Sequence, residues 1–295
     1  MSARVFLVDA SPYIFRAFFS LPSDMTDREG RPSGAIHGFT DFLLRILREH
    51  RPTHLEVAFD FHLSRSFRNR FYPEYKAHRD APPADLEAQV ARCMDVAGFL
   101  GARTHIVEDY EADDIVGTLC HQLEDSDADL TLVSSDKDLS QLVGPRVSLL
   151  DFARGDLYGP AEVRTKFGVR PDQIVDYLGL AGDSVDNIPG VRGVGPKTAA
   201  ALLGSFESLE EIYESIARVS SLDIRGAQGV ARRLEAHRAA AFLSRRLATI
   251  ALDTPIAETL ATLELAPPNA PELRQLLDEL ESEGLAQRVE ALLAG

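Results

Sequence analysis

The sequence predicts an α/β protein with a mostly parallel central sheet flanked by helices, followed by a second, helical domain. Three runs rich in apolar and β-branched residues end at Asp9, Asp60 and Asp136, and such runs are typical of buried parallel strands. A helical pattern of apolar residues follows each run, as expected where helices connect parallel strands. The later part of the chain has a helical pattern alone. We therefore expect an α/β domain over residues 1–158 and a helical domain over residues 159–295.

Length and composition set the class of protein. At 295 residues, 45% of them apolar, the chain is long enough to bury a full core. Cys93 and Cys120 lie in helical patterns, so we expect core thiols rather than a disulfide or a metal site. The sequence has no signal peptide and no apolar run long enough to span a bilayer, which predicts a cytoplasmic protein without membrane contact.

The net charge of −15 is unusual for a nucleic-acid-binding protein, for which a basic footprint is the usual sign. Much of the acid, however, lies in the tail after Pro255 and in two dense groups, and the basic residues are bunched. The distribution of charge is therefore more informative than the total.

The apolar spacing gives the elements of the first domain. Strands are expected over residues 5–8, 55–59, 130–133 and 147–151. Amphipathic helices are expected over residues 11–19, 39–48 and 86–100, the first with its aromatic residues toward the core. Gly155 and Gly159 follow the last strand at a spacing typical of a hairpin, so Asp151 is interpreted as structural.

Five carboxylates crowd the segments Tyr110–Asp114 and Ser135–Asp138, at the starts of two further predicted helices. Acid at a helix start is ordinary, because it caps free N–H groups and suits the helix dipole. The strand ends change this interpretation, because the carboxyl ends of neighbouring parallel strands share one edge of a sheet, where ligands bind. Aspartate fills about one position in twenty of an average chain, so its presence at three strand ends is not expected by chance.

Such a gathering of negative charge requires cations. Two like charges about 4 Å apart repel by roughly 4 kcal/mol at an effective dielectric of about 20. Carboxylates without a supporting set of His or Cys ligands favour Mg²⁺ or Mn²⁺ over zinc. Two such ions about 4 Å apart suit an in-line displacement at phosphorus.

A basic and aromatic segment follows Asp60. Its cations are opposed by Glu74 alone and alternate with aromatic rings: Arg65, Arg68, Arg70, Lys76 and Arg79 with Phe67, Phe71, Tyr72 and Tyr75. Cations bind phosphates and ring faces stack on bases, so the segment suits single-stranded nucleic acid, with a solvated basic loop as the alternative. With the helix after it, the segment over about residues 62–90 is expected to form a mobile arch above the acidic edge. Arg16 is either a solvated helix charge or a bidentate phosphate clamp.

The second domain contains a glycine-rich stretch, Gly190–Ala200, preceded by Asp183 and Asp186. A Gly-Val-Gly turn that opens a helix lets backbone N–H groups meet a phosphate, and Lys197 and Thr198 add a charge and a hydroxyl. The spacing is not that of a Walker A loop. A helix–hairpin–helix over about residues 175–205 that grips the duplex backbone without reading bases fits better. The remaining expectations for this domain are helices over residues 199–203 and 209–216, a phosphate-tracking basic stretch over 225–246, and a last helix from Glu272.

Together these motifs resemble the 5′ nuclease domain of bacterial DNA polymerase I and its flap endonuclease relatives, over essentially the whole chain. The matching motifs are Phe6–Asp9, Phe59–Asp60, Ser66–Arg68, Tyr75–Arg79, Tyr110–Asp114, Ser135–Leu139, Gly182–Val191 and Gly193–Ala199. The resemblance implies a PIN-like nuclease core, a helical arch that the 5′ end threads, and a C-terminal helix-hairpin-helix (H3TH) domain. The tail ends about where a polymerase-linked proofreading domain would start, so we expect a free-standing nuclease.

The resemblance also implies the metal ligands, for two Mg²⁺ ions that Mn²⁺ can replace. One ion is expected on Asp9, Asp60, Glu111 and Asp113, and the other on Asp136, Asp138, Asp183 and Asp186, with Asp114 in support. Stand-alone relatives of the exonuclease IX type have lost several second-site carboxylates. This sequence keeps them, which predicts activity.

For nucleic acid, the resemblance assigns Arg16, Lys76 and Arg79 to the scissile phosphate and the 5′ strand, with Tyr75 stacking and Arg68 also on DNA. The duplex contacts are expected from the hairpin residues Gly193, Val194, Gly195, Pro196, Lys197 and Thr198. The resemblance places K⁺ on the backbone carbonyls of Leu180, Ala181, Pro189, Val191 and Val194. One departure is Phe61-His62-Leu63, where relatives often carry a small residue and a lysine.

The expected function is that of a monomeric, structure-specific, metal-dependent 5′-3′ exonuclease and flap endonuclease. Its substrates are expected to be DNA with a 5′ flap, 5′ overhang or branch, and RNA-primed DNA. Two alternatives stay open: a non-catalytic structure-specific DNA-binding protein, and a toxin-like single-domain ribonuclease with a similar sheet and acid cluster.

Overall fold

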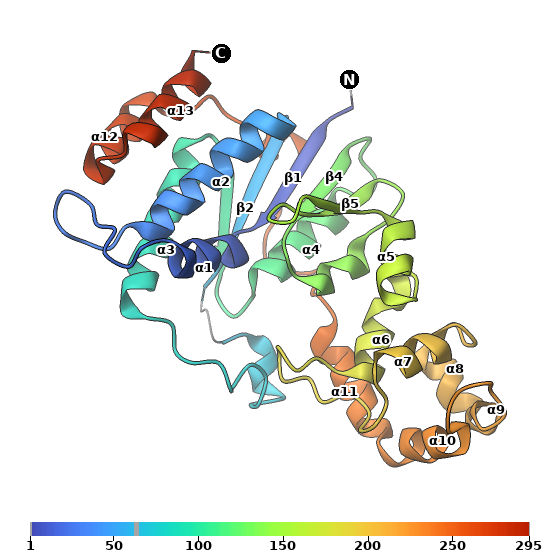
Figure 1. Cartoon of the computed structure of the whole chain (residues 1–295). Helices are drawn as coiled ribbons and strands as arrows, with labels where there is room; N and C mark the ends of the chain where they lie inside the picture. Colours follow the sequence, from blue (N-terminus) through green and yellow to red (C-terminus); the bar gives the residue numbers. More distant parts are fainter. Residues whose placement is uncertain (1, 62–64, 295) are drawn as a thin grey trace.

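The computed structural model describes residues 2–61 and 65–294, which form a sheet covered on both faces and a helical region beyond one edge of it (Figure 1). The sheet has six strands in the order β3-β2-β1-β4-β5-β6. They span Arg4–Asp9 (β1), His54–Asp60 (β2), Arg103–Val107 (β3), Asp129–Val133 (β4), Val147–Asp151 (β5) and Asp156–Tyr158 (β6). All neighbours are parallel except β5 and β6. The mostly parallel sheet is therefore confirmed.

The sequence analysis missed β3, and the structure explains why. This strand lies at the edge of the sheet, paired with β2 alone, and Arg103 and Ile106 are exposed. An edge strand in this position lacks the continuous apolar run of a buried strand. The β5–β6 hairpin is confirmed, with Gly155 in the left-handed region at φ 74°.

The first three long helices cover one face of the sheet. They are α1 (Ser11–Ser20), α2 (Gly34–His50) and α3 (Ala84–Phe99). Their apolar faces pack on Leu55, Val57 and Phe59 of β2 in one core cluster. The expected helices are confirmed, although α2 begins at Gly34 rather than Phe39 and Phe19 of α1 points to solvent, 68% exposed.

The C-terminal tail corrects the expected domain division. Two helices, α12 (Ala270–Leu280) and α13 (Glu283–Leu293), replace the single helix expected in the second domain. They lie on α2 and α3, on the same side of the sheet (Figure 1). Leucines on one side of α12, among them Leu273 and Leu276, belong to the same core cluster as β2. An apolar helix face is buried wherever the chain path allows, so the tail belongs to the first domain.

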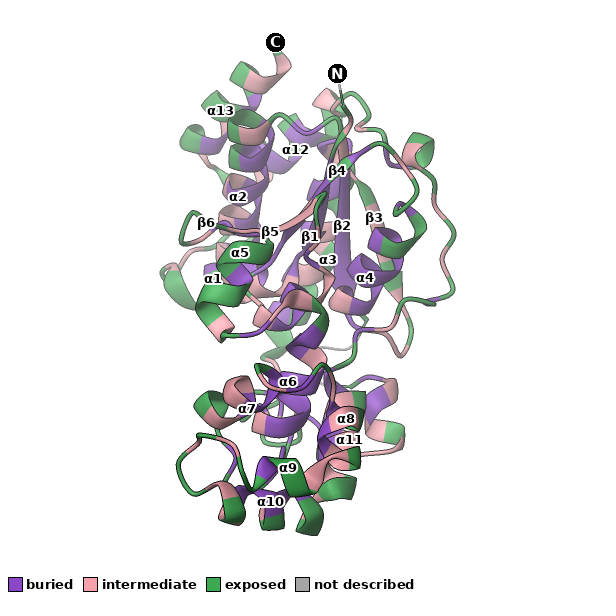
Figure 2. Ribbon diagram, turned by 90° about the vertical axis from the view of Figure 1, so that its right-hand side faces the viewer, coloured by how far each residue is buried: buried purple, intermediate pink, exposed green. Residues whose placement is uncertain are grey.

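The opposite face of the sheet carries α4 (Ala112–Gln122). The helical region below the sheet contains seven helices among the described residues: α5 (Pro160–Phe167), α6 (Ile174–Ala181), α7 (Pro196–Leu203), α8 (Leu209–Glu214), α9 (Ile216–Val219), α10 (Ala227–Ala236) and α11 (Arg238–Ala248). Most of α6 is buried there (Figure 2). None of the described helices is both long and apolar enough to span a membrane.

The chain returns from α11 along α4 to the sheet. Thr118 and Gln122 of α4 hydrogen-bond this return segment, through Thr254 N at 3.1 Å and Ile256 O at 2.8 Å. The segment then reaches η4 (Leu260–Leu263) and pairs beside the start of β2, where Leu265 N donates to Thr53 O at 3.0 Å. These hydrogen bonds attach the second region to the first.

A buried acid and a histidine fix the end of this return segment. Glu56, in the middle of β2, is fully buried, and its Oε1 lies 2.9 Å from His105 Nδ1. The other ring nitrogen of His105 lies 3.1 Å from Glu258. Burial raises the pKa of Glu56 to about 7, and the hydrogen bond to Glu56 raises the pKa of His105. The two side chains therefore retain a shared proton near neutral pH.

The Glu56–His105 pair predicts that the free energy of unfolding decreases as the pH rises. Both groups bind protons more tightly in the folded state, so their contribution is present at low pH and is lost as the pH passes about 7. Glu56→Gln keeps a hydrogen-bonding side chain without this titration. Between pH 5.5 and pH 8 the variant should lose about 1–3 kcal/mol less unfolding free energy than the wild type, measured by urea denaturation.

The control is Glu235→Gln, which removes an exposed carboxylate on α10 and should leave the pH slope unchanged. A Glu56→Gln protein with the wild-type pH slope would contradict the assignment of the titration to this pair.

Candidate active site

Carboxylates from separate parts of the chain meet at the carboxyl edge of the sheet, as the sequence predicts. Asp9 and Asp60 are the last residues of β1 and β2, and Asp136 follows β4. These three line one pocket of about 240 Å³ together with Glu111 and Asp113. Parallel strands deliver their carboxyl ends to one edge, and the pocket lies there.

Short polar contacts orient these carboxylates. Ser134 Oγ donates to Asp9 at 2.8 Å, and Ser11 Oγ donates to Asp60 at 2.5 Å. Backbone N–H groups add to this, because Ala112 N donates to Asp60 at 2.7 Å and Asp138 N donates to Asp136 at 2.9 Å. The sequence analysis did not assign Ser11 and Ser134. Their position within two residues of the end of a strand that leads to the acidic edge is the signal that identifies them.

The start of α4 supplies the densest part of the cluster. Glu111 is its N-cap, and Asp113 and Asp114 lie in the first turn. Each of these three residues can bring one carboxylate oxygen to within 4.8 Å of the others. The helix dipole favours negative charge here, but three carboxylates at such spacing exceed what one helix end stabilises.

The loop after α6 brings two further carboxylates from the second region. Asp183 forms an ion pair with Lys137, whose Nζ lies 3.9 Å from Asp138. Asp186 and Glu111 are joined by the hydroxyl of Tyr75, at 3.3 Å and 3.1 Å. The acidic site therefore spans both regions of the chain.

The pKa shifts show how strongly these charges interact. Burial and the neighbouring Asp60 raise the pKa of Asp9 to about 8. Burial and Asp136 raise the pKa of Asp138, and burial and Asp114 raise that of Asp113. Glu111 differs, because Lys76 and Arg68 outweigh the effect of its burial and lower its pKa to about 2. The protein's own cations thus compensate only part of the negative charge.

The donor set fits hard divalent cations. Asp113 Oδ1 and Asp138 Oδ1 are buried without a hydrogen-bond partner among the described residues. A buried carboxylate oxygen without a partner is costly, and a cation would satisfy it. The clustered donors are all carboxylate oxygens, the type that Mg²⁺ and Mn²⁺ prefer.

Two basic side chains line the same pocket. Lys76 forms an ion pair with Glu111 and lies 3.8 Å from Asp186, and Arg79 Nη2 lies 2.5 Å from Asp186. Arg16, on α1, is exposed and lines a neighbouring hollow of about 380 Å³ with Ser135. Lys76 and Arg79 are therefore inside the acidic pocket, and Arg16 lies beside it.

Arg68 and Tyr75 correct the expected DNA contacts, because both are buried, with exposures of 1% and 3%. Arg68 pairs with Glu111 at 2.9 Å and with Asp114 through two bonds of 2.8 Å, and it donates to the carbonyls of Leu247 and Thr249. Both side chains hold the carboxylates in place. Asp114 is a support for the same reason, since protein donors bind both of its oxygens.

Over the range expected to form the arch, the described residues between β2 and α3 form a 3₁₀ turn, η1 (Phe67–Arg70), and an irregular run that leads into α3. The run lies on the loop of the second region, because Lys76 N donates to Asp186 O at 3.0 Å and Asn187 Nδ2 donates to Glu74 O at 2.7 Å. In the segment Phe61-His62-Leu63, which departs from the family pattern, His62 and Leu63 lie outside the described residues.

The glycine-rich hairpin between α6 and α7 has a tightly constrained base. Gly182 and Gly190 both have positive φ, and a Cβ on Gly190 would lie 2.4 Å from Gly182 N. Among the expected DNA contacts, Gly193, Gly195, Pro196 and Lys197 are exposed, Thr198 is half-buried and Val194 is buried.

The expected K⁺ ligands lie at the base of this hairpin. Of their carbonyls, those of Leu180 and Val191 accept hydrogen bonds from Val191 N and Val194 N.

The basic stretch over residues 225–246 divides into two groups. Arg245 is paired with Asp176 and Glu210, and Arg246 lies 3.9 Å from the centre of the Phe71 ring. Arg225, Arg232 and Arg233 form no ion pair within the described part of the chain. The stretch is thus partly structural, and these three side chains remain candidates for phosphate contact.

Two domain descriptions of one family match the chain. The N-terminal resolvase-like domain of 5′-3′ exonucleases matches residues 4–168, and their C-terminal SAM fold matches residues 169–271. DNA polymerase I of Rhizobium leguminosarum is 39% identical over 293 residues, which are 97% of this chain and 28% of that protein. The 5′-3′ exonuclease of Buchnera aphidicola subsp. Schizaphis graminum is 36% identical over 253 residues, which are 85% of this chain and 88% of that protein. The chain thus spans less than a third of the length of the Rhizobium polymerase.

Solved structures show the same fold. The zinc-bound T5 5′-exonuclease superposes with a TM-score of 0.66 at 18% identity, over 99% of this chain and 98% of that one. The catalytic core of Rad2 in complex with a DNA substrate gives a TM-score of 0.65 at 14% identity, over 99% and 92%. With both domain descriptions matched in order along one chain, the protein belongs to the 5′-3′ exonuclease family.

Proposed function

We propose that the chain is a structure-specific, metal-dependent 5′-3′ exonuclease and flap endonuclease that hydrolyses DNA phosphodiesters near 5′ ends and branch points. The observation that supports it best is the convergence of Asp9, Asp60, Glu111, Asp113 and Asp136 in one pocket with Lys76 and Arg79. A pocket with both an anionic wall and two cations can hold metal ions and a phosphate together. A non-catalytic DNA-binding protein has no use for this cluster.

Two Mg²⁺ ions are proposed for the carboxylates, with Mn²⁺ as a substitute. Asp9, Asp60, Glu111 and Asp113 would hold one ion, and Asp136, Asp138, Asp183 and Asp186 the other. The buried oxygens of Asp113 and Asp138 that have no hydrogen-bond partner among the described residues support one ion in each half. When bound, such ions supply an activated water and stabilise charge on the leaving oxygen.

The chain's own residues bind and orient the phosphate. Lys76 and Arg79 lie in the pocket and neutralise charge that grows on the phosphate oxygens. Arg16, in the adjoining hollow, is placed to hold a neighbouring phosphate of the 5′ strand. T5 flap endonuclease has been solved with DNA and metal ions, which supports the same combination here.

Duplex DNA is proposed to lie on the hairpin and the start of α7. The exposed residues Gly193, Gly195, Pro196 and Lys197 offer backbone and charge without an acid in the first turn of the helix. A K⁺ ion on the carbonyls of Leu180, Ala181, Pro189, Val191 and Val194 would brace this hairpin. We also propose that the protein is a monomer. Its proposed substrates are DNA with 5′ flaps, overhangs or branches, and RNA-primed DNA.

Replacing one carboxylate in either half of the cluster should abolish cleavage and spare binding. For Asp113→Asn and Asp136→Asn we expect the cleavage rate of a 5′-labelled flap in Mg²⁺ to fall by about a hundredfold or more. Flap affinity in EDTA should change less than about threefold, because charge repulsion decreases and the DNA surface is intact. Asp109→Asn, at a half-buried aspartate paired with Arg70, is the control. Wild-type rates in either active-site variant would refute the site.

Metal binding should also raise the stability of the free protein. At a Mg²⁺ concentration ten times the Kd, ion binding stabilises the folded state by about 1.4 kcal/mol, seen as an upward shift of Tm. The shift should vanish in Asp9→Asn/Asp136→Asn, whose metal-free Tm should equal or exceed that of the wild type because repulsion is relieved. An equal Mg²⁺ shift in this double variant and the wild type would argue against these ligands.

The hairpin lysine should contribute to affinity for any duplex sequence. Lys197→Gln is expected to weaken duplex binding and to reduce the slope of log K against log salt by about 1, since one phosphate contact is lost. Arg31→Gln, at an exposed residue paired with Asp27, should leave the slope unchanged. Anisotropy titrations between 50 and 200 mM salt give the slope for each variant. Equal slopes for the lysine variant and the wild type would exclude the contact.

A further inference from the structure

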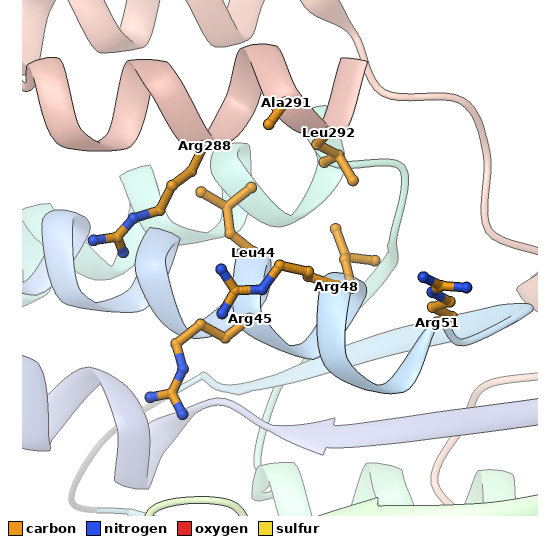
Figure 3. Close-up of a pocket in the computed structure, with 8 residues that line it drawn as sticks. Leu44, Arg45, Arg48, Arg51, Arg288, Ala291 and Leu292 are labelled. Atoms are coloured by element: carbon orange, nitrogen blue, oxygen red, sulfur yellow. The ribbon is translucent and has the colours of Figure 1, made fainter. Parts of the chain in front are cut away.

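Another hollow, of about 570 Å³, lies between α2 and α13, on the side of the sheet that carries the C-terminal helices (Figure 3). Its apolar surface comes from Leu44 and Leu47 of α2 and from Ala291 and Leu292 of α13. The volume is within the range of sites that enclose a small ligand or a few side chains, about 300–1,000 Å³.

Four arginines surround this hollow: Arg45, Arg48 and Arg51 at the end of α2, and Arg288 on α13. Figure 3 shows Arg48 between Leu44 and Arg51, with Arg288 on the opposite helix. Arg45 and Arg48 share Glu49, at 3.2 Å and 3.0 Å, and Arg288 pairs with Asp41. Arg51 has no acidic partner within the described residues. In a chain of net charge −15, this is a local excess of positive charge.

The hollow is separate from the acidic pocket. Arg51 stands just before β2, which runs from His54 to Asp60 at the carboxyl edge. A strand of that length spans roughly 20 Å, so the hollow lies near the amino ends of the strands and the acidic pocket near their carboxyl ends. The arginines are therefore not part of the proposed catalytic surface.

We infer that this hollow binds an acidic peptide segment of a partner protein that also carries apolar side chains. The arginine forks suit carboxylates, which they bind in bidentate geometry. The leucines and the alanine suit an apolar side chain placed between the charged groups. Duplex DNA matches only the charge and would leave the apolar surface without a contact. A surface that combines arginine with an apolar centre is typical of protein interfaces.

The test uses the full chain and a fluorescein-labelled peptide, Glu-Asp-Leu-Glu-Asp-Phe, in anisotropy titrations. Wild type should bind with a Kd of roughly 10–100 µM, as expected of a short peptide with few anchors. Arg48→Gln/Arg51→Gln should weaken binding by at least about tenfold, because charge-assisted hydrogen bonds are lost. A control pair of equal charge, Arg146→Gln/Arg164→Gln, lies away from the hollow and should change the Kd less than about twofold.

Two control peptides separate the contribution of the acidic side chains from that of the apolar side chains. Replacing the acids by Gln and Asn, or Leu and Phe by Ser, should each abolish binding, and flap cleavage should be the same in the wild type and both double variants. The inference is overturned if wild type does not bind the peptide, if the all-polar acidic peptide binds equally well, or if the two arginine pairs have equal effects. A dimer that dissociates in Arg48→Gln/Arg51→Gln would also overturn it, by showing that a second copy covers the hollow.

Discussion

Repulsion among buried carboxylates is the constraint on which this structure depends. Three strand ends, one helix start and one loop of the second region bring carboxylates to a single edge of the sheet. In water such charges would separate. Here the backbone holds them together, and the cost is visible in the raised pKa values of Asp9, Asp113 and Asp138. The protein offsets part of this cost with serine hydroxyls, backbone N–H groups and basic side chains, and the repulsion that remains favours the proposed binding of cations.

Arg68 is the most important of these compensating groups. Its guanidinium joins Asp114 and Glu111 of α4 to the carbonyls of Leu247 and Thr249, where α11 ends. Removing one partner of such a buried network leaves an uncompensated charge, which is strongly destabilising. The network therefore links the acidic edge of the sheet to the helical region that carries the hairpin. The geometry of the proposed chemistry and that of the proposed DNA surface are coupled through one buried side chain.

The second region is thus not an independent module attached by a flexible linker. The loop after α6 contributes Asp183 and Asp186 to the acidic edge, and the segment after α11 runs back along α4 to Glu56 and His105 of the sheet. The tail then adds α12 and α13 to the first domain, where they complete a core face and create the arginine-rimmed hollow. The chain crosses between the two regions twice, so the glycine-rich hairpin and the acidic site are held in a fixed relation.

The sequence alone predicted the parallel sheet and the gathering of aspartates at its strand ends, because strand periodicity and the shared carboxyl edge follow from local pattern. It also predicted the glycine-rich hairpin, from a Gly-Val-Gly turn that opens a helix. Tertiary structure decided what pattern does not encode: that β3 is an edge strand, that α12 and α13 return to the first domain, and that Arg68 and Tyr75 are buried. A basic or aromatic residue has the same local signature in a DNA-binding loop and in a buried ion network. Which of the two it joins depends on distant partners such as Asp114 and Leu247, brought together by the packing of the whole chain.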